Sequence, residues 1–168
     1  MGYSTRFTSK IAVVLMWAAT SSAAFATDTT IQVSLGDRGP DSVMLDDMHQ
    51  MGMGMAMTDM TMALMSITAD VTTIPAGKVT FEVTNASKDI VHEMVVSPLT
   101  EGQTGLPYVA DDYKVDEEAA GHLGEVAELD PGKSGSLTVD MVPGSYIIYC
   151  NIPGHFVNGM WALITVTE

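Results

Sequence analysis

Apolar and polar residues alternate in short segments along most of this chain of 168 residues. The first segment spans 29–35, where Ile31, Val33 and Leu35 alternate with polar neighbours. A period of two is typical of a β-strand that buries one face. Further strand signals occupy 65–71, 79–83, 91–96, 137–141, 145–150 and 161–167. The pattern predicts an all-β fold, a β-sandwich of about seven to eight strands, although a closed barrel fits the same pattern.

The region 97–133 interrupts this alternation, because it is long, acidic and rich in glycine. We expect it to be irregular, with at most a helical turn over 116–120. Shorter breaks at 75–77, 85–87 and 142–144 contain the glycine, proline, asparagine and serine that are typical of turns. The predicted strands are therefore joined mainly by short connections, with one long exception.

The first 26 residues predict export. Arg6 and Lys10 precede an apolar run over 11–19, and small residues follow as far as Ala26. This order is that of a secretory signal peptide, and the apolar run is too short for a stable membrane span. We expect cleavage after Ala26 and a periplasmic or otherwise exported protein with no stable membrane insertion. An uncleaved anchor is the alternative.

The charge balance is strongly acidic, with 21 Asp and Glu against 7 Lys and Arg and a formal net charge of −14 at pH 7. Such a surface repels the phosphates of nucleic acids and anionic lipids. We therefore exclude nucleic acid as a partner and expect basic proteins or cations instead.

Three residues near the C-terminus carry the chemistry of a metal site. Cys150 is the only cysteine, and His155 and Met160 follow it with four residues between successive members. A lone cysteine in an exported protein cannot form an internal disulfide, which favours a metal ligand. A thiolate, an imidazole and a thioether suit copper, whose blue sites combine two histidines, one cysteine and a weak axial methionine.

A second histidine must then come from another part of the chain. His92, in the predicted strand 91–96, is the first candidate, and His122, in the acidic loop, is its main rival and otherwise a solvated bystander. A Cys–His hydrolase that uses Cys150 and His155 is rejected, because no third group of recognisable type orients the histidine. We therefore expect no enzymatic activity.

Nine of the 14 methionines lie between Met44 and Met65. Thioethers select Cu(I) over most other metals, so this segment is a candidate for secondary Cu(I) sites. An adaptable apolar surface and oxidant scavenging are alternatives. We expect the segment to lie outside the core. The candidate ligands are Met48, His49, Met51, Met53, Met55, Met57 and Met60.

The loop Cys-Asn-Ile-Pro-Gly-His-Phe-Val-Asn-Gly-Met over 150–160 resembles the ligand loop of the cupredoxins, and above all that of rusticyanin, auracyanin and sulfocyanin. The resemblance extends over about 67–167. It implies a Greek-key β-sandwich with one type 1 copper held by His92, Cys150 and His155, with Met160 axial. Many members have a small polar residue after the first histidine that ties the two ligand loops, whereas this chain has Glu93. The methionine-rich segment is similar to the tails of periplasmic copper-tolerance proteins.

These observations divide the chain into a signal peptide (1–26), a first strand with the methionine-rich segment (27–65) and a cupredoxin domain (66–168). They predict a monomeric, periplasmic type 1 copper protein that carries single electrons by Cu(I)/Cu(II) cycling. Its partners would be redox proteins such as basic cytochromes, which would meet a solvent-facing patch of Pro153, Phe156 and Val157 at the edge of His155. The alternative function is copper tolerance or copper buffering, through the cupredoxin site and the methionine-rich segment.

Overall fold

The computed structural model describes residues 1–2, 28–42, 51–54 and 63–168. Most of the predicted signal peptide lies outside these residues, and so do Met48, His49, Met55, Met57 and Met60 of the methionine-rich segment. In the part of the chain that is described, no helix is long and apolar enough to cross a membrane.

One layer of the fold is a four-stranded sheet with the order β2-β1-β4-β9. Strand β1 pairs antiparallel with β2 and parallel with β4, which in turn pairs antiparallel with β9. The predicted alternation is present, since Ile31, Val33 and Leu35 of β1 are buried while their neighbours in the strand are more exposed. The strands of this sheet are β1 (Thr29–Asp37), β2 (Met65–Ala69), β4 (Gly77–Asn85) and β9 (Ser134–Met141).

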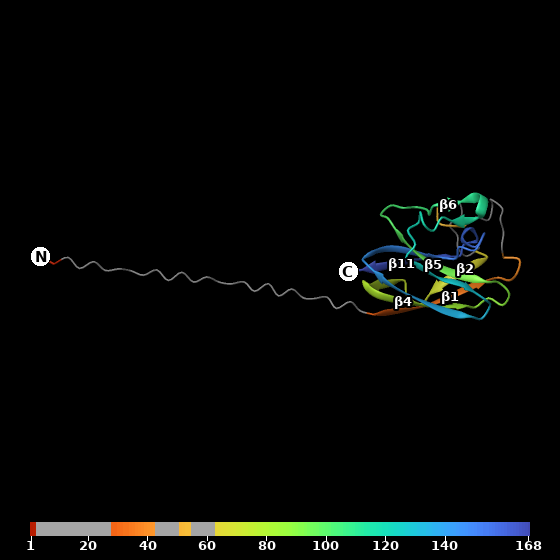
Figure 1. Ribbon diagram of the computed structural model, residues 1–168, viewed down its shortest axis with the longest axis horizontal. Helices are drawn as coiled ribbons and strands as arrows, with labels where there is room; N and C mark the ends of the chain where they lie inside the picture. Colours follow the sequence, from red (N-terminus) through yellow and green to blue (C-terminus); the bar gives the residue numbers. More distant parts are fainter. Residues whose placement is uncertain (3–27, 43–50, 55–62) are drawn as a thin grey trace.

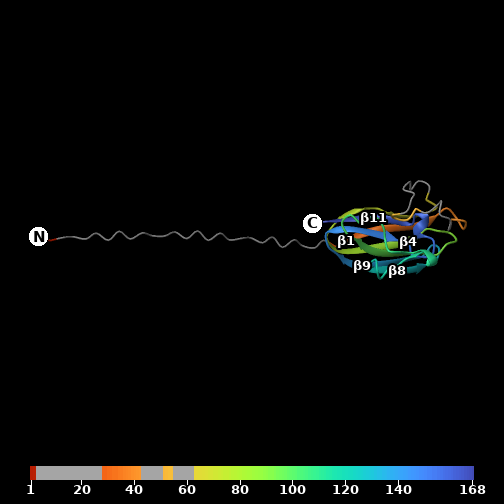
Figure 2. The ribbon, with the colours of Figure 1, turned by 90° about the horizontal axis from the view of Figure 1, so that it is seen from above.

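The second layer is a five-stranded sheet with the order β3-β11-β10-β5-β8. Strand β10 lies between β11 and β5 and pairs antiparallel with both. Figure 2 shows the strands of the sandwich running along its long direction. The strands of this sheet are β3 (Thr73–Pro75), β5 (His92–Leu99), β8 (Gly124–Leu129), β10 (Gly144–Tyr149) and β11 (Trp161–Thr167).

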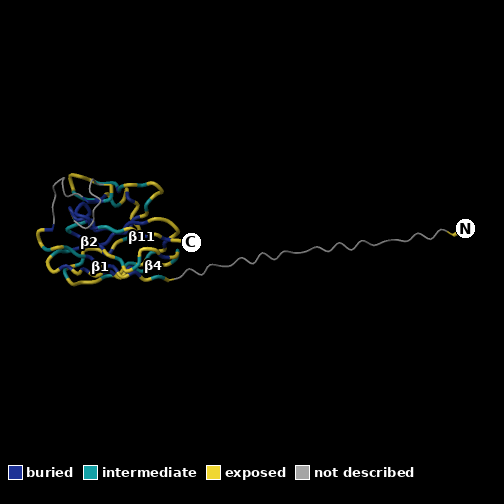
Figure 3. Tube along the Cα trace, turned by 180° about the vertical axis from the view of Figure 1, so that it is seen from behind, coloured by how far each residue is buried: buried dark blue, intermediate teal, exposed yellow. Residues whose placement is uncertain are grey.

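Apolar side chains from both sheets meet in one core. Leu35 and Phe81 from the first sheet and Met94, Ile148 and Ile164 from the second are all fully buried there. The buried segments of the trace in Figure 3 lie largely in this interior. The fold is therefore the predicted all-β sandwich of two sheets and not a closed barrel. Within the described residues the two sheets contain nine strands, slightly more than expected.

Strand β5 is an exception to alternation, because its first six residues are all buried. Met94 and Val96 face the sandwich core, whereas Val95 belongs to a second apolar cluster on the outer side of the sheet, with Leu106 and Val115. These two come from the region 97–133, which covers that side and includes β6 (Tyr108–Val109), η2 (Ala110–Asp112) and β7 (Lys114–Val115). In Figure 1 the strand β6 lies beyond β11 and β5, away from β1 and β4. The region is thus more ordered than its composition predicts.

Candidate metal centre

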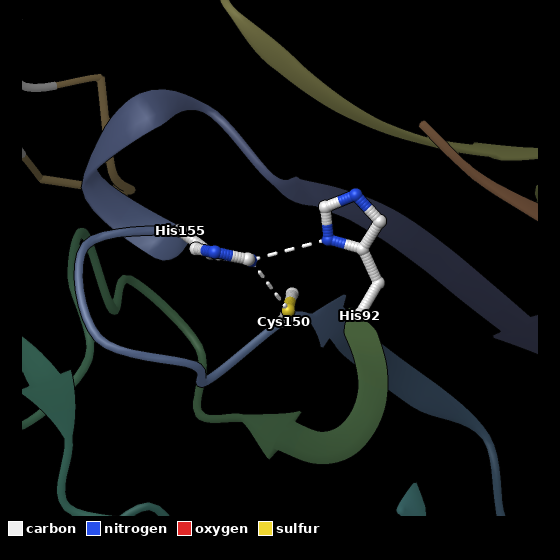
Figure 4. Close-up of side chains that lie close together, drawn as sticks. All are labelled: His92, Cys150 and His155. Atoms are coloured by element: carbon white, nitrogen blue, oxygen red, sulfur yellow. Dashed lines mark hydrogen bonds between the residues drawn. The ribbon is translucent and has the colours of Figure 1, made fainter. Parts of the chain in front are cut away.

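Two adjacent strands bring His92 and Cys150 together. His92 is the first residue of β5, and Cys150 directly follows β10, which pairs with β5 so that Tyr149 lies opposite Val95. His155 reaches the same point from the loop after Cys150 (Figure 4). The Nδ1 atom of His155 lies 3.2 Å from Nδ1 of His92 and 3.3 Å from Sγ of Cys150. All three side chains are buried, with exposed fractions of 3% or less.

The loop 150–160, which we call the ligand loop, is held in shape by its own hydrogen bonds. The Cys150 N–H donates to the Met160 carbonyl at 3.0 Å, and the Met160 N–H donates to the His155 carbonyl at 3.2 Å. Gly154 and Gly159 have positive φ values of 85° and 94°, which side chains disfavour. The short helix η3 (Phe156–Asn158) lies between them. Backbone hydrogen bonds and these glycine conformations therefore define the shape of the loop.

Met160 completes the donor set. It is fully buried, belongs to the same core cluster as Cys150 and is tied to Cys150 and His155 by the two backbone hydrogen bonds of the loop. Two imidazoles, one thiolate and one thioether in a buried site are the ligands of blue copper. Copper held by these residues would supply one-electron redox chemistry by alternating between Cu(I) and Cu(II).

The protonation chemistry of the donors also suits a metal. Burial lowers the pKa of the His155 imidazole to about 4, with a further contribution from the nearby His92, so this ring is neutral at physiological pH. Burial raises the pKa of the Cys150 thiol to about 12, against the hydrogen bonds from the N–H groups of Glu93 and Ile152. A soft metal cation would displace the thiol proton and would compensate the charge of the buried thiolate.

Asp37 at the end of β1 contacts the Nε2 atom of His92, on the side of the ring that faces away from His155. Its Oδ2 lies 3.0 Å from Nε2 of His92, and the aspartate side chain is only 4% exposed. Burial opposes ionisation of Asp37, but hydrogen bonds from Ser87, His92 and the Gly39 N–H outweigh it and lower the pKa of the carboxyl group. The carboxylate accepts the Nε2 proton of His92, which leaves Nδ1 free as a donor to a metal.

Glu93 links the two segments that supply the ligands. Its N–H donates to Sγ of Cys150 at 3.4 Å, and its Oε1 accepts a hydrogen bond from the Asn151 N–H at 3.0 Å. Asn151 in turn bonds the backbone of Val115 and the carboxylate of Glu117. The glutamate that departs from the family pattern therefore still ties the ligand segments together.

The structure brings the predicted donors His92, Cys150 and His155 together, and several residues around them carry no signal in the sequence. His122 is exposed, and its ring contacts the Glu117 carbonyl and not the site, as expected of a bystander. Asp37 and Asn151 carried no signal in the sequence, because their partners lie 55 and 58 residues away.

The predicted solvent-facing patch is wrong, because Phe156 and Val157 are 1% and 0% exposed. Both pack in the outer apolar cluster with Leu106 and Val115, beneath the covering region 97–133. Of the three residues, only Pro153 is exposed.

Part of the methionine-rich segment contacts the ligand loop, contrary to the expectation that it would lie apart from the core. Met51 is 3% exposed, its N–H donates to the Val157 carbonyl, and its carbonyl accepts the indole N–H of Trp161 at 2.7 Å. Met53 is half-buried and packs against the outer apolar cluster.

The chain is similar to known copper proteins in sequence and in fold. Residues 66–168 match the family model described as the sulfocyanin (SoxE) domain. The structure of auracyanin B is similar at 22% identity and a TM-score of 0.50, over 83% of this chain and 89% of that one. Rusticyanin from Thiobacillus ferrooxidans is similar at 17% identity and a TM-score of 0.50, over 82% of this chain and 77% of that one.

At these identities the two structures support the fold alone, and a comparison with curated proteins finds no match. The family match does not depend on these two structures. It covers most of the chain and includes every residue of the donor set. The chain therefore belongs to the sulfocyanin domain family of cupredoxins, and His92, Cys150, His155 and Met160 form its type 1 copper site.

Proposed function

We propose that this protein is an exported carrier of single electrons between larger redox proteins. The observation that carries the proposal is the buried set of His92, Cys150, His155 and Met160 in a loop that the fold already holds in place. A preformed site limits rearrangement between the two oxidation states, which favours fast electron transfer. The donor set contains no group placed to act on a substrate.

Export to the periplasm is supported by the order of basic, apolar and small residues before Ala26. Intact-mass measurement of the protein isolated from its native cells tests this part of the proposal. We expect a chain that begins at Thr27, and a mass that retains residues 1–26 would contradict it.

A basic redox partner is supported by acidic residues next to the ligand loop. The exposed Asp111 and Asp112 lie in η2, within the region 97–133. This region bonds the ligand loop directly, since the Gly154 N–H donates to the Tyr113 carbonyl at 2.9 Å. Negative charge at this position would steer a cationic protein towards the copper and raise the association rate at low salt.

The partner proposal is tested by electron transfer to a cationic cytochrome c as a function of ionic strength. We expect the rate constant to fall with salt and to fall severalfold at low salt in the variant Asp111→Asn/Asp112→Asn. The matched control is Glu82→Gln/Asp140→Asn, which removes two exposed charges from the four-stranded sheet. Equal effects of the two variants would contradict docking beside the ligand loop, and a salt-independent rate would contradict a basic partner.

The second candidate function is copper tolerance or buffering, in which the methionine-rich segment captures Cu(I). The contacts of Met51 favour it, because its N–H bonds the Val157 carbonyl in the ligand loop and its carbonyl bonds Trp161, the residue after that loop. A carrier of electrons alone does not need additional thioethers.

Competition with a Cu(I) chelator separates the two functions. Leucine resembles methionine in size but has no sulfur, so the variant Met48→Leu/Met55→Leu/Met57→Leu/Met60→Leu removes thioethers and keeps Met51 in place. If the segment binds copper, the wild type takes up more than one equivalent of Cu(I) and the variant takes up fewer. A single equivalent in both proteins would contradict copper capture by the segment.

A further inference from the structure

We propose that Asp37 is a positioning residue that fixes the donor orientation of His92 and lowers the reduction potential of the copper site. The Oδ2 atom of Asp37 lies 3.0 Å from Nε2 of His92, on the side of the ring opposite to Nδ1, which faces His155. The inference deepens the proposed electron-carrier function and rests on it. Asp37 lies outside the matched family segment 66–168, so the N-terminal strand contributes to the site.

The fold holds the carboxylate in this position from several sides. The Oδ1 atom of Asp37 accepts the Gly39 N–H at 2.7 Å, and the Ser87 hydroxyl donates to the same carboxylate. The Ser87 Oγ accepts the N–H groups of Asp89 and Ile90 in the turn that leads into β5. Asp37 is therefore oriented by hydrogen bonds from the protein itself.

The sheet register explains why an N-terminal residue reaches this turn. Strand β1 runs parallel to β4 with Leu35 opposite Asn85, and the Ala86 N–H donates to the Leu35 carbonyl at 2.8 Å. The Asn85 side chain then bonds the Ile90 carbonyl at 2.9 Å. The end of β1 and the start of β5 are thus joined by the turn between β4 and β5.

The carboxylate has two effects on the histidine. It accepts the proton on Nε2, which selects the tautomer whose Nδ1 lone pair points towards His155 and Cys150. It also strengthens the imidazole as a donor and places a negative charge next to the site. Both effects stabilise Cu(II), the more highly charged state, more than Cu(I), and therefore lower the potential.

The test compares copper-loaded wild type with Asp37→Asn and Asp37→Ala. Asparagine has the shape of aspartate and can still accept the Nε2 proton, but it carries no charge. We expect Asp37→Asn to keep copper and the thiolate absorption band and to lose about tenfold in affinity for Cu(II) relative to Cu(I). For a one-electron couple this loss raises the potential by about 59 mV. The matched control is Asp70→Asn. The Asp70 carboxylate accepts the N–H of Gln32, which lies in β1 like Asp37 but away from the site.

A second measurement does not need copper. Long-range proton–nitrogen NMR of the apoprotein should report the Nε2–H tautomer of His92 in the wild type and a tautomer mixture in Asp37→Ala. An unchanged potential in Asp37→Asn, or a shift equal to that of Asp70→Asn, would overturn the proposed charge effect. An unchanged tautomer in Asp37→Ala would overturn the positioning role. Because neither measurement involves a redox partner, failure of the carrier function would be seen separately, in the electron-transfer rates with cytochrome c.

Discussion

The Glu93 N–H donates a hydrogen bond to Sγ of Cys150 over 3.4 Å, across 57 residues of sequence. The carboxylate of the same glutamate accepts the N–H of Asn151, the residue after the cysteine. One side chain and its own backbone therefore connect the strand that carries His92 to the loop that carries the other three ligands. Hydrogen bonds to a ligating sulfur and the stiffness of its support both influence the potential of a copper site.

Replacement of Glu93 by glutamine should change how the stability of the apoprotein depends on pH. Burial raises the pKa of Glu93 from 4.5 to about 7, with Lys114 acting against the shift and Glu117 and Glu125 adding to it. Between these two values the folded state keeps a proton that the unfolded state has lost. The contribution of Glu93 is therefore fully present below pH 4.5 and is lost as the pH rises through 7.

Glutamine cannot ionise, so the variant Glu93→Gln does not lose this stability. As the pH rises across this range, its free energy of unfolding relative to wild type should increase by about 3 kcal/mol. Urea unfolding of both apoproteins at several pH values measures the difference. A difference that stays constant with pH would contradict the raised pKa.

The second histidine ligand is tested by two alanine substitutions. His92→Ala removes a buried donor and should abolish the normal visible spectrum of the copper-loaded protein. His122→Ala removes an exposed ring that contacts the Glu117 carbonyl in the acidic loop and should leave the spectrum unchanged. Visible absorption after copper loading is sufficient to compare them, and the opposite pattern would transfer the ligand role to His122.

Much of this site could be predicted because three of its donors lie within one short loop. The spacing of Cys150, His155 and Met160 is local in sequence, and the strand pattern was enough to place His92 on a neighbouring element. The burial of Phe156 could not be predicted, because its cover comes from the region 97–133, whose acidic composition indicates solvent exposure. Strand β8 was missed for a similar reason, since Val126 is its only buried residue.

The other features that the sequence does not predict depend on contacts between segments that are distant in the chain. Nothing near Asp37 in the sequence indicates His92, because the two meet only through the register of β1 with β4. Likewise, the bond from Trp161 to the Met51 carbonyl spans 110 residues. Strand β1 likewise precedes the matched segment 66–168 but pairs along its length with β4 of that segment in one sheet.

Substitution of Met160 by leucine should raise the reduction potential. Leucine fills a similar buried volume but donates no electrons, and the loss of a weak donor destabilises Cu(II) more than Cu(I). We expect copper and the absorption band to be retained and the potential to rise by about 59 mV or more, which corresponds to at least a tenfold change in relative affinity. Protein-film voltammetry measures the shift. An unchanged or lower potential would contradict a ligand role for Met160.

The most direct test of the copper assignment is metal loading of the wild type and of Cys150→Ser, with copper content and visible spectrum recorded on the same samples. Serine replaces the buried thiol with little change of volume, so the apo-fold should be retained, but a hydroxyl is a poor substitute for a soft thiolate. We predict an intense thiolate-to-copper absorption band in the wild type, with one copper in the type 1 site, and no such band in Cys150→Ser. Retention of the band in Cys150→Ser, or its absence from copper-loaded wild type, would contradict the assignment.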